Sequence, residues 1–141
     1  MGIRQWLMLP EIAAITDIDA PAVVALHAQI IKKKPFLRLI YKEIYEGFKR
    51  RLPPRPDVRV VELGSGGGFI KEIIPTAITS DVLPAPGVDM HFSALNMPFP
   101  ADSLDALLMF DVFHHIPDVE RFLSEACRFQ ARWKNTHGGA G

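Results

Sequence analysis

Cysteine is almost absent from this chain, which has one, Cys127, among 141 residues. A single cysteine excludes a disulfide within the chain and favours a reducing compartment, so we expect a cytoplasmic protein. We interpret Cys127 as a small buried apolar residue on its helix. No cluster of cysteine, histidine and carboxylate side chains has the spacing of metal ligands, so the sequence predicts no metal site.

The chain also lacks net charge and long apolar runs. Its 16 lysines and arginines balance 16 aspartates and glutamates, which argues against a nucleic-acid-binding protein. No apolar stretch approaches the ~20 residues of a membrane-spanning helix, and the first residues show neither a signal peptide nor a myristoylation motif. With 48% hydrophobic residues and no internal repeat, we expect one folded domain.

The most informative segment runs from Val60 to Phe69 and reads VVELGSGGGF. An apolar run, an acid and glycines at alternate positions predict a buried strand that turns sharply into a helix with an accessible backbone. Phe69 stands where the dinucleotide fingerprint GxGxxG needs its third glycine, so that fingerprint does not match. Amides at the start of a helix favour a carboxylate ligand. The alternative is a tight turn in another kind of α/β protein.

The pattern ExGxGxG resembles motif I of the class I S-adenosylmethionine-dependent methyltransferases, and the resemblance extends over residues 20–129. It implies an α/β, Rossmann-like three-layer sandwich with parallel strands in the order 3-2-1-4, preceded by N-terminal helices. It also implies S-adenosyl-L-methionine as the cofactor, with Glu62 reaching the methionine amine. The cofactor would lie along the loop that contains Gly64, Ser65, Gly66 and Gly68.

We expect a short helix that begins near Phe69 and is ended by Pro75. A second parallel strand is expected over residues 77–80, with Asp81 at its carboxyl end. Asp81 follows Glu62 by 19 positions, where an acid of a βαβ unit can accept hydrogen bonds from both hydroxyls of a ribose. A turn or cap residue is the alternative interpretation. The next residues, Val82 and Leu83, would form an apolar wall against the adenine.

A third strand is expected over residues 88–92, followed by the segment SALNMPF. This segment is similar to the family's DAxxLPF, whose acid binds the adenine amino group. The resemblance therefore places Ser93 and Ala94 at the adenine. Because a serine accepts a hydrogen bond without the help of a charge, we expect weaker cofactor binding.

The fourth strand is expected over residues 106–110, and the residues after it resemble the family's motif with paired histidines. By that resemblance, Phe110 and Asp111 flank the cofactor, and His114 or His115 faces the methyl acceptor. We favour helix capping and packing for the histidines over a role as general base, so no catalytic residue is assigned. Adjacent histidines cannot present both rings to one metal from a helix face, which argues against zinc.

Residues 1–52 are interpreted as a helical lead-in, with helices at 21–34 and from Phe36 onward. We interpret the aromatic stripe of the second helix as a packing face and the lysines at 32–34 as a solvated helix end. Contact of these lysines with an anionic lipid or substrate is the alternative. Residues 53–129 form the partial cofactor-binding domain. Its last helix starts after Asp118 and has an apolar face of Val119, Phe122, Leu123 and Ala126.

Residues 130–141 show neither the KPGG turn nor the three further strands that the resemblance calls for, and we interpret them as a disordered tail foreign to the fold. We therefore expect a methyltransferase truncated after its fourth strand, whose uncovered edge favours self-association. Two other functions stay open. One is an inactive module that binds cofactor weakly; the other is a nucleotide-dependent oxidoreductase, which the glycine spacing disfavours. The methyl acceptor is not indicated, since acceptor contacts come from variable elements.

Overall fold

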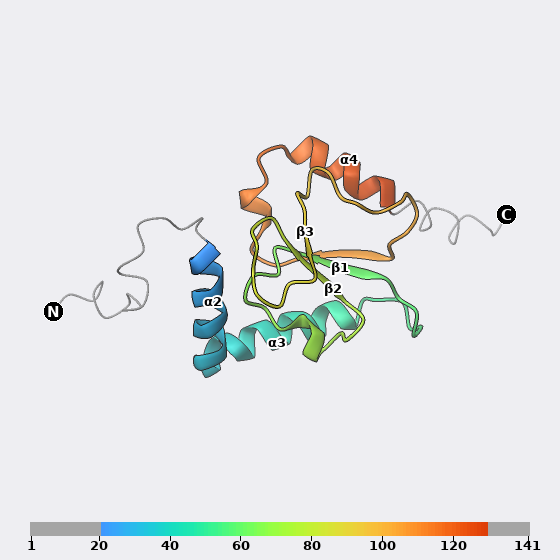
Figure 1. Cartoon of the computed structure of the whole chain (residues 1–141). Coiled ribbons are helices and arrows are strands. Elements are labelled where there is room, and N and C mark those ends of the chain that lie inside the picture. Colours follow the sequence, from blue (N-terminus) through green and yellow to red (C-terminus); the bar gives the residue numbers. More distant parts are fainter. Residues whose placement is uncertain (1–20, 130–141) are drawn as a thin grey trace.

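A computed structural model describes residues 21–129 of the chain (Figure 1). The predicted tail at 130–141 and the first 20 residues lie outside the described residues. The elements follow one another in the order α2 (Pro21–Lys33), α3 (Pro35–Lys49), β1 (Val60–Leu63), η1 (Ile70–Glu72), β2 (Ile78–Asp81), β3 (Met90–His91), β4 (Ala106–Met109), η2 (Phe113–His115) and α4 (Val119–Phe129).

Four parallel strands form one sheet in the order β3-β2-β1-β4. Strand β1 lies in the middle, with Val61 level with Ile78 of β2 on one side and with Leu107 of β4 on the other. All four residues of β1 are buried, as expected for a parallel strand covered on both faces. The predicted Rossmann-like α/β fold, preceded by helices, is therefore confirmed.

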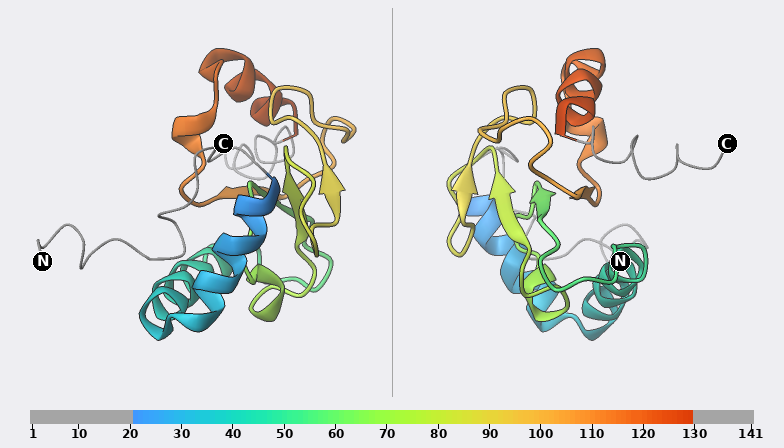
Figure 2. Two further views of the ribbon diagram at one scale, coloured as in Figure 1. Left: turned by 60° about the vertical axis from the view of Figure 1, so that its left-hand side comes forward. Right: turned by 90° about the vertical axis from the view of Figure 1, so that its right-hand side faces the viewer.

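Helices cover both faces of the sheet, as the two views of Figure 2 show. The core on one face joins α2, α3 and η1 to β1, with Ile31, Tyr45, Ile70 and Val60 at its centre. The core on the other face lies beneath α4 and contains Val61, Leu63, Phe122 and Phe129. Because strand side chains alternate between faces, Glu62 lies on the same side as Val60, toward α3.

Two predicted elements differ from the structure. The short helix expected between Phe69 and Pro75 is present as a 3₁₀ turn of three residues, Ile70–Glu72, and not as an α-helix. The loop amides therefore do not benefit from the dipole of an α-helix. Strand β3 is only two residues long, Met90–His91, although residues 88–92 were predicted.

The burial predicted for α4 is also partly wrong. Its start is as expected, since the backbone N of Arg121 donates to Asp118 Oδ1 at 3.0 Å, which is an N-cap. However, Leu123 is 51% exposed and Cys127 is exposed. The apolar stripe of α4 is wider than the surface that covers it within residues 21–129.

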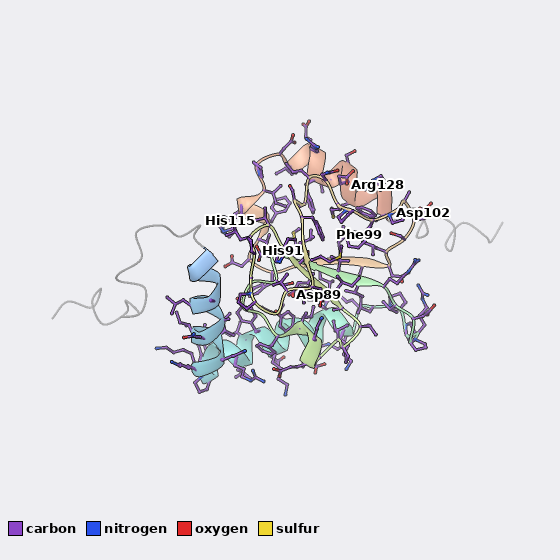
Figure 3. All side chains as sticks on the ribbon, in the orientation of Figure 1. Asp89, His91, Phe99, Asp102, His115 and Arg128 are labelled. Atoms are coloured by element: carbon purple, nitrogen blue, oxygen red, sulfur yellow. The ribbon has the colours of Figure 1, made fainter. Side chains whose placement is uncertain are left out.

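A polar cluster around Asp89, the residue just before β3, joins this end of the sheet to β2 and η1 (Figure 3). The Asp89 carboxylate accepts hydrogen bonds from Thr79 N and Oγ1, both at 2.9 Å, and from Lys71 Nζ at 2.5 Å. These contacts, that from Lys71 above all, lower the pKa of Asp89. They explain how a strand as short as β3 is held in register with β2.

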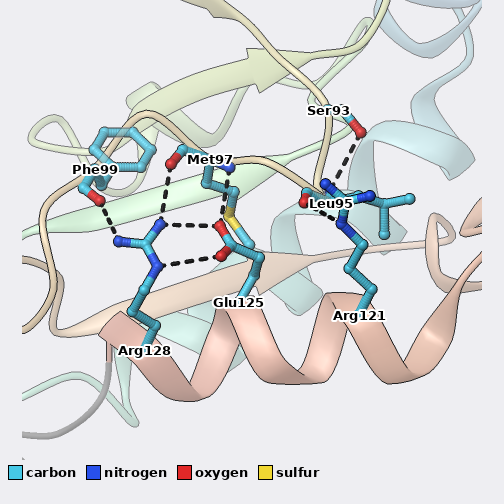
Figure 4. A network of polar contacts seen from close by, with 7 residues as sticks. All are labelled: Ser93, Leu95, Met97, Phe99, Arg121, Glu125 and Arg128. Atoms are coloured by element: carbon cyan, nitrogen blue, oxygen red, sulfur yellow. Dashed lines mark hydrogen bonds and ion pairs between the residues drawn. The ribbon is translucent and has the colours of Figure 1, made fainter.

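A second polar cluster fastens α4 to the loop between β3 and β4 (Figure 4). Arg128 donates through Nη1 to Phe99 O at 2.7 Å and through Nη2 to Met97 O at 3.2 Å. Glu125 Oε2 accepts from Met97 N at 3.1 Å and from Arg128 Nη2 at 2.9 Å. Arg128 and Glu125 thus form a clamp on this loop. Because the loop follows β3 in the chain, the clamp fixes the segment in which Ser93 and Ala94 lie.

Candidate functional site

The glycine loop has a backbone that other residues adopt only with strain. Gly64 has φ 63° and Gly66 has φ 45°, in the left-handed region that glycine enters at no cost. A Cβ on Gly64 would also collide with the side chain of Val112, just beyond β4. The glycine at position 64 thus lets the segments that follow β1 and β4 approach each other.

The N-terminal helices pack directly on the other side of this loop. A Cβ on Gly67 would collide with the backbone of Ala28 in α2, and one on Gly68 with the hydroxyl of Tyr45 in α3. From the sequence, we expected the exposed backbone of the glycines to contact a ligand. In the structure the space beside Gly64, Gly67 and Gly68 is used by the chain itself, so α2 and α3 form one wall of the site.

Strand β2 holds the loop on its remaining side. Ser65 N donates to Ser80 O at 2.9 Å, and Gly66 N donates to Asp81 Oδ2 at 3.0 Å. Asp81 Oδ1 accepts from Leu83 N at 3.0 Å, which is the turn role left open by the sequence. A carboxylate oxygen can accept more than one hydrogen bond, so binding of a ribose by Asp81 stays a prediction that these contacts allow.

Glu62 is an acid buried at the end of β1, with 2% of its surface exposed. Its Oε2 atom has no hydrogen-bond partner within the described part of the chain. Burial raises the pKa of Glu62 to about 7, an effect that hydrogen bonding by the Ser65 and Tyr45 side chains partly offsets. A buried acceptor without a partner has a high free energy, which a donor from a ligand would lower.

Aromatic side chains from two elements stand beside this acid. The ring of Tyr41 in α3 meets that of Phe110 edge to face, with centroids 5.0 Å apart. Burial raises the pKa of Tyr41, and the negative charges of Asp111 and Glu62 raise it further. From the sequence, we favoured a packing face for the stripe that contains Tyr41 and Tyr45 over a face that contacts the substrate. Their spacing marks one helix face but does not reveal that this face reaches Glu62.

The residues after β4 form the exposed part of the site. Asp111 has φ 58°, a strained conformation for a residue with a side chain and one that is common at functional sites. His114 Nδ1 lies 3.7 Å from Asp111 Oδ1. The packing role predicted for the histidines is wrong, because His114 and His115 are exposed on η2 and their rings lie against each other, with centroids 4.0 Å apart.

The residues predicted to contact the adenine lie in the turns after β2 and β3. Val82 is 68% exposed, so its side chain is free to contact a ligand. Ser93 Oγ accepts a hydrogen bond from Leu95 N at 3.2 Å, which gives it a role in the turn. Ala94 is half-buried against the core beneath α4. Their contact with the adenine stays a prediction.

A cavity of about 500 Å³ lies elsewhere, at the amino ends of the strands, where Val58, Ile78 and Leu104 line it. The acids and the glycine loop lie at the carboxyl ends. No group of three or more histidine, cysteine or acidic side chains suited to a metal ion occurs in the described ranges. Parallel α/β sheets bind ligands beyond their carboxyl ends, so the edge that carries Glu62, Asp81 and the glycine loop is the candidate ligand site.

The chain belongs to the methyltransferase domain family, which matches residues 61–131, half of its length. A structure of a SAM dependent methyltransferase from Aquifex aeolicus is similar over 61% of this chain and 57% of that protein's chain, at 15% sequence identity and a TM-score of 0.49. No curated protein matches the chain. The family assignment implies S-adenosylmethionine as the cofactor, in agreement with the sequence pattern.

Proposed function

We propose that this chain binds S-adenosylmethionine at the carboxyl edge of its sheet and directs methyl transfer to a small-molecule acceptor. The observation that carries the proposal is the buried Glu62 carboxyl, whose Oε2 lacks a partner beside the glycine loop. The methionine part of the cofactor carries an ammonium group, which supplies the missing donor and the opposite charge.

Each predicted contact has a separate role in this proposal. Glu62 binds the methionine amine, and the loop around Ser65 and Gly66 lies along the methionine part. Asp81 accepts the ribose hydroxyls, and the adenine lies between the turns after β2 and β3. The proposed cofactor-binding residues are Glu62, Gly64, Ser65, Gly66, Gly68, Asp81, Val82, Ser93, Ala94 and Phe110.

Bound S-adenosylmethionine supplies an activated methyl group, so the chain needs mainly to orient the two reactants. Tyr41 and Phe110 would exclude water from one side of the sulfonium, because their rings meet beside Glu62. No general base is assigned. Asp111 and His114 are the polar groups nearest the acceptor side by their position after β4.

Calorimetry with S-adenosylmethionine, S-adenosylhomocysteine and NAD tests this proposal. We expect both sulfur compounds to bind and NAD to fail. Glu62→Gln keeps the shape of the side chain and removes its charge, so it should weaken binding by about tenfold or more. Glu43→Gln, which changes an exposed glutamate of α3, is the matched control. Binding of NAD with equal affinity would instead favour the oxidoreductase.

A module that binds the cofactor without catalysis is the second candidate. Two observations favour it. Ser93 replaces the acid that the family places at the adenine, and both oxygens of Asp81 already accept hydrogen bonds from backbone amides. Binding of S-adenosylhomocysteine without release of it from S-adenosylmethionine, over a broad set of acceptors, would favour this candidate.

A further inference from the structure

The corner between α2 and α3 exposes large apolar side chains. Helix α2 ends at Lys33 and α3 begins at Pro35, so one residue separates the two helices. Just beyond the corner, Phe36 is 71% exposed and Leu39 is 55% exposed. Residues three apart share one face of a helix. Phe36 is the most exposed of the large apolar side chains in the described part of the chain.

The same corner concentrates positive charge. Residues 21–42 contain four lysines, one arginine and no acid, although the whole chain has equal numbers of acids and bases. Arg38 is engaged elsewhere, in an ion pair with Glu72 at 2.5 Å and above the ring of Phe69 at 4.5 Å. No ion pair within residues 21–129 involves the lysines at positions 32, 33, 34 and 42.

The corner lies close to the proposed cofactor site. Ala28 of α2 packs against Gly67 of the glycine loop, and Lys32 follows Ala28 by about one helical turn, or ~6 Å. Figures 1 and 2 show α2 standing at one side of the molecule and meeting α3 at its lower end. A surface that bound this corner would therefore lie beside the carboxyl edge of the sheet.

We propose that the α2–α3 corner docks on an anionic membrane surface. Phe36 and Leu39 would enter the boundary between headgroups and acyl chains, and the lysines would contact anionic headgroups. Lysines at a helix C-terminus also suit its dipole, but that explanation leaves the exposed Phe36 and Leu39 unexplained. Within residues 21–129 no helix is long and apolar enough to cross a membrane, so this contact is peripheral. It does not depend on the proposed methyl transfer.

Sedimentation of the full chain with lipid vesicles tests the proposal. We expect binding to vesicles of phosphatidylglycerol and phosphatidylcholine, little binding to pure phosphatidylcholine, and a loss of binding at high salt. Replacing Lys32, Lys33 and Lys34 by glutamine should reduce partitioning by about fivefold for each lysine. The double variant Phe36→Ser, Leu39→Ser should reduce it by about tenfold or more.

Matched controls come from equally exposed residues elsewhere. Leu123→Ser removes an apolar side chain that is 51% exposed on α4, and Lys49→Gln with Arg50→Gln removes two charges at the far end of α3. Both should leave vesicle binding unchanged. Equal losses in these controls would overturn the proposal, as would absence of vesicle binding. Loss with the lysine variant but not with Phe36→Ser, Leu39→Ser would also overturn it and indicate a soluble polyanion as the partner.

Discussion

Glu62 makes the stability of this protein depend on pH in a direction that is unusual for an acid. Its pKa is raised from 4.5 to about 7 by burial, so the folded chain keeps a proton that the unfolded chain releases. The folded state therefore binds more protons between these two values. Stability is full below pH 4.5, declines as the pH rises toward about 7, and then levels off.

We predict that Glu62→Gln removes this decline. A neutral amide has no charge to desolvate, so the variant should gain up to about 3 kcal/mol relative to the parent at pH 8 and little at pH 4. Urea unfolding at a series of pH values gives the difference directly. Asp89 and Glu125 have lowered pKa values, so their contributions to the free energy of unfolding are lost as the pH falls below about 4. A difference in unfolding free energy between the Glu62→Gln variant and the parent that does not change with pH would contradict the raised pKa of Glu62.

At the scale of elements, α4 depends on its clamp to the loop after β3. Arg128 reaches two carbonyl groups and the Glu125 carboxylate, and its guanidinium also lies 4.2 Å above the ring of Phe129. We predict that Arg128→Ala lowers the free energy of unfolding, because Met97 O and Phe99 O lose their donor. Arg121→Ala, which removes one hydrogen bond to Leu95 O, should cost less than half as much.

A double-mutant cycle separates the clamp from general packing. Because Glu125 and Arg128 share Met97 as a partner, the loss in the double alanine variant should be smaller than the sum of the two single losses. Thermal or urea unfolding measures all four chains. Additive losses would show that the two side chains act independently and that the clamp is not a unit.

The sequence predicted those elements whose apolar composition matches the way in which neighbouring elements cover them in the fold. Strand β1 was predictable because an apolar run before a glycine loop rarely forms anything else. The N-cap role of Asp118 was predictable because capping depends on residues that are neighbours in the sequence. β3 was predicted too long, since the contacts of Asp89 that precede it are not recorded by periodicity. The short helix that Pro75 ends was predicted, but its 3₁₀ type was not. The role of Tyr45 was missed for a related reason: spacing identifies a helix face, but only the fold shows that this face meets Glu62.

At the scale of the whole molecule, strand β4 leaves one edge of the described sheet unpaired. Strand β4 pairs with β1 alone within residues 21–129, and its four residues are only half-buried. Unpaired strand edges favour association with another chain. We predict reversible self-association that increases with concentration in analytical ultracentrifugation. A monomer at every concentration would contradict it, and loss of association in Leu123→Ser would place the contact on α4 instead.

The position of β1 also sets the order in which the chain becomes protected during synthesis. β1 is the first strand to be made, yet its neighbours arrive later, β2 from residue 78 and β4 from residue 106. Pairing of Val60 with Ala106 spans 46 residues, so the most buried strand of the folded protein stays partly uncovered until about four-fifths of the described segment has left the ribosome. Nascent chains with such delayed long-range pairing fold slowly and are prone to aggregate. The interval between β1 and β4 is therefore where a chaperone would have the most to protect.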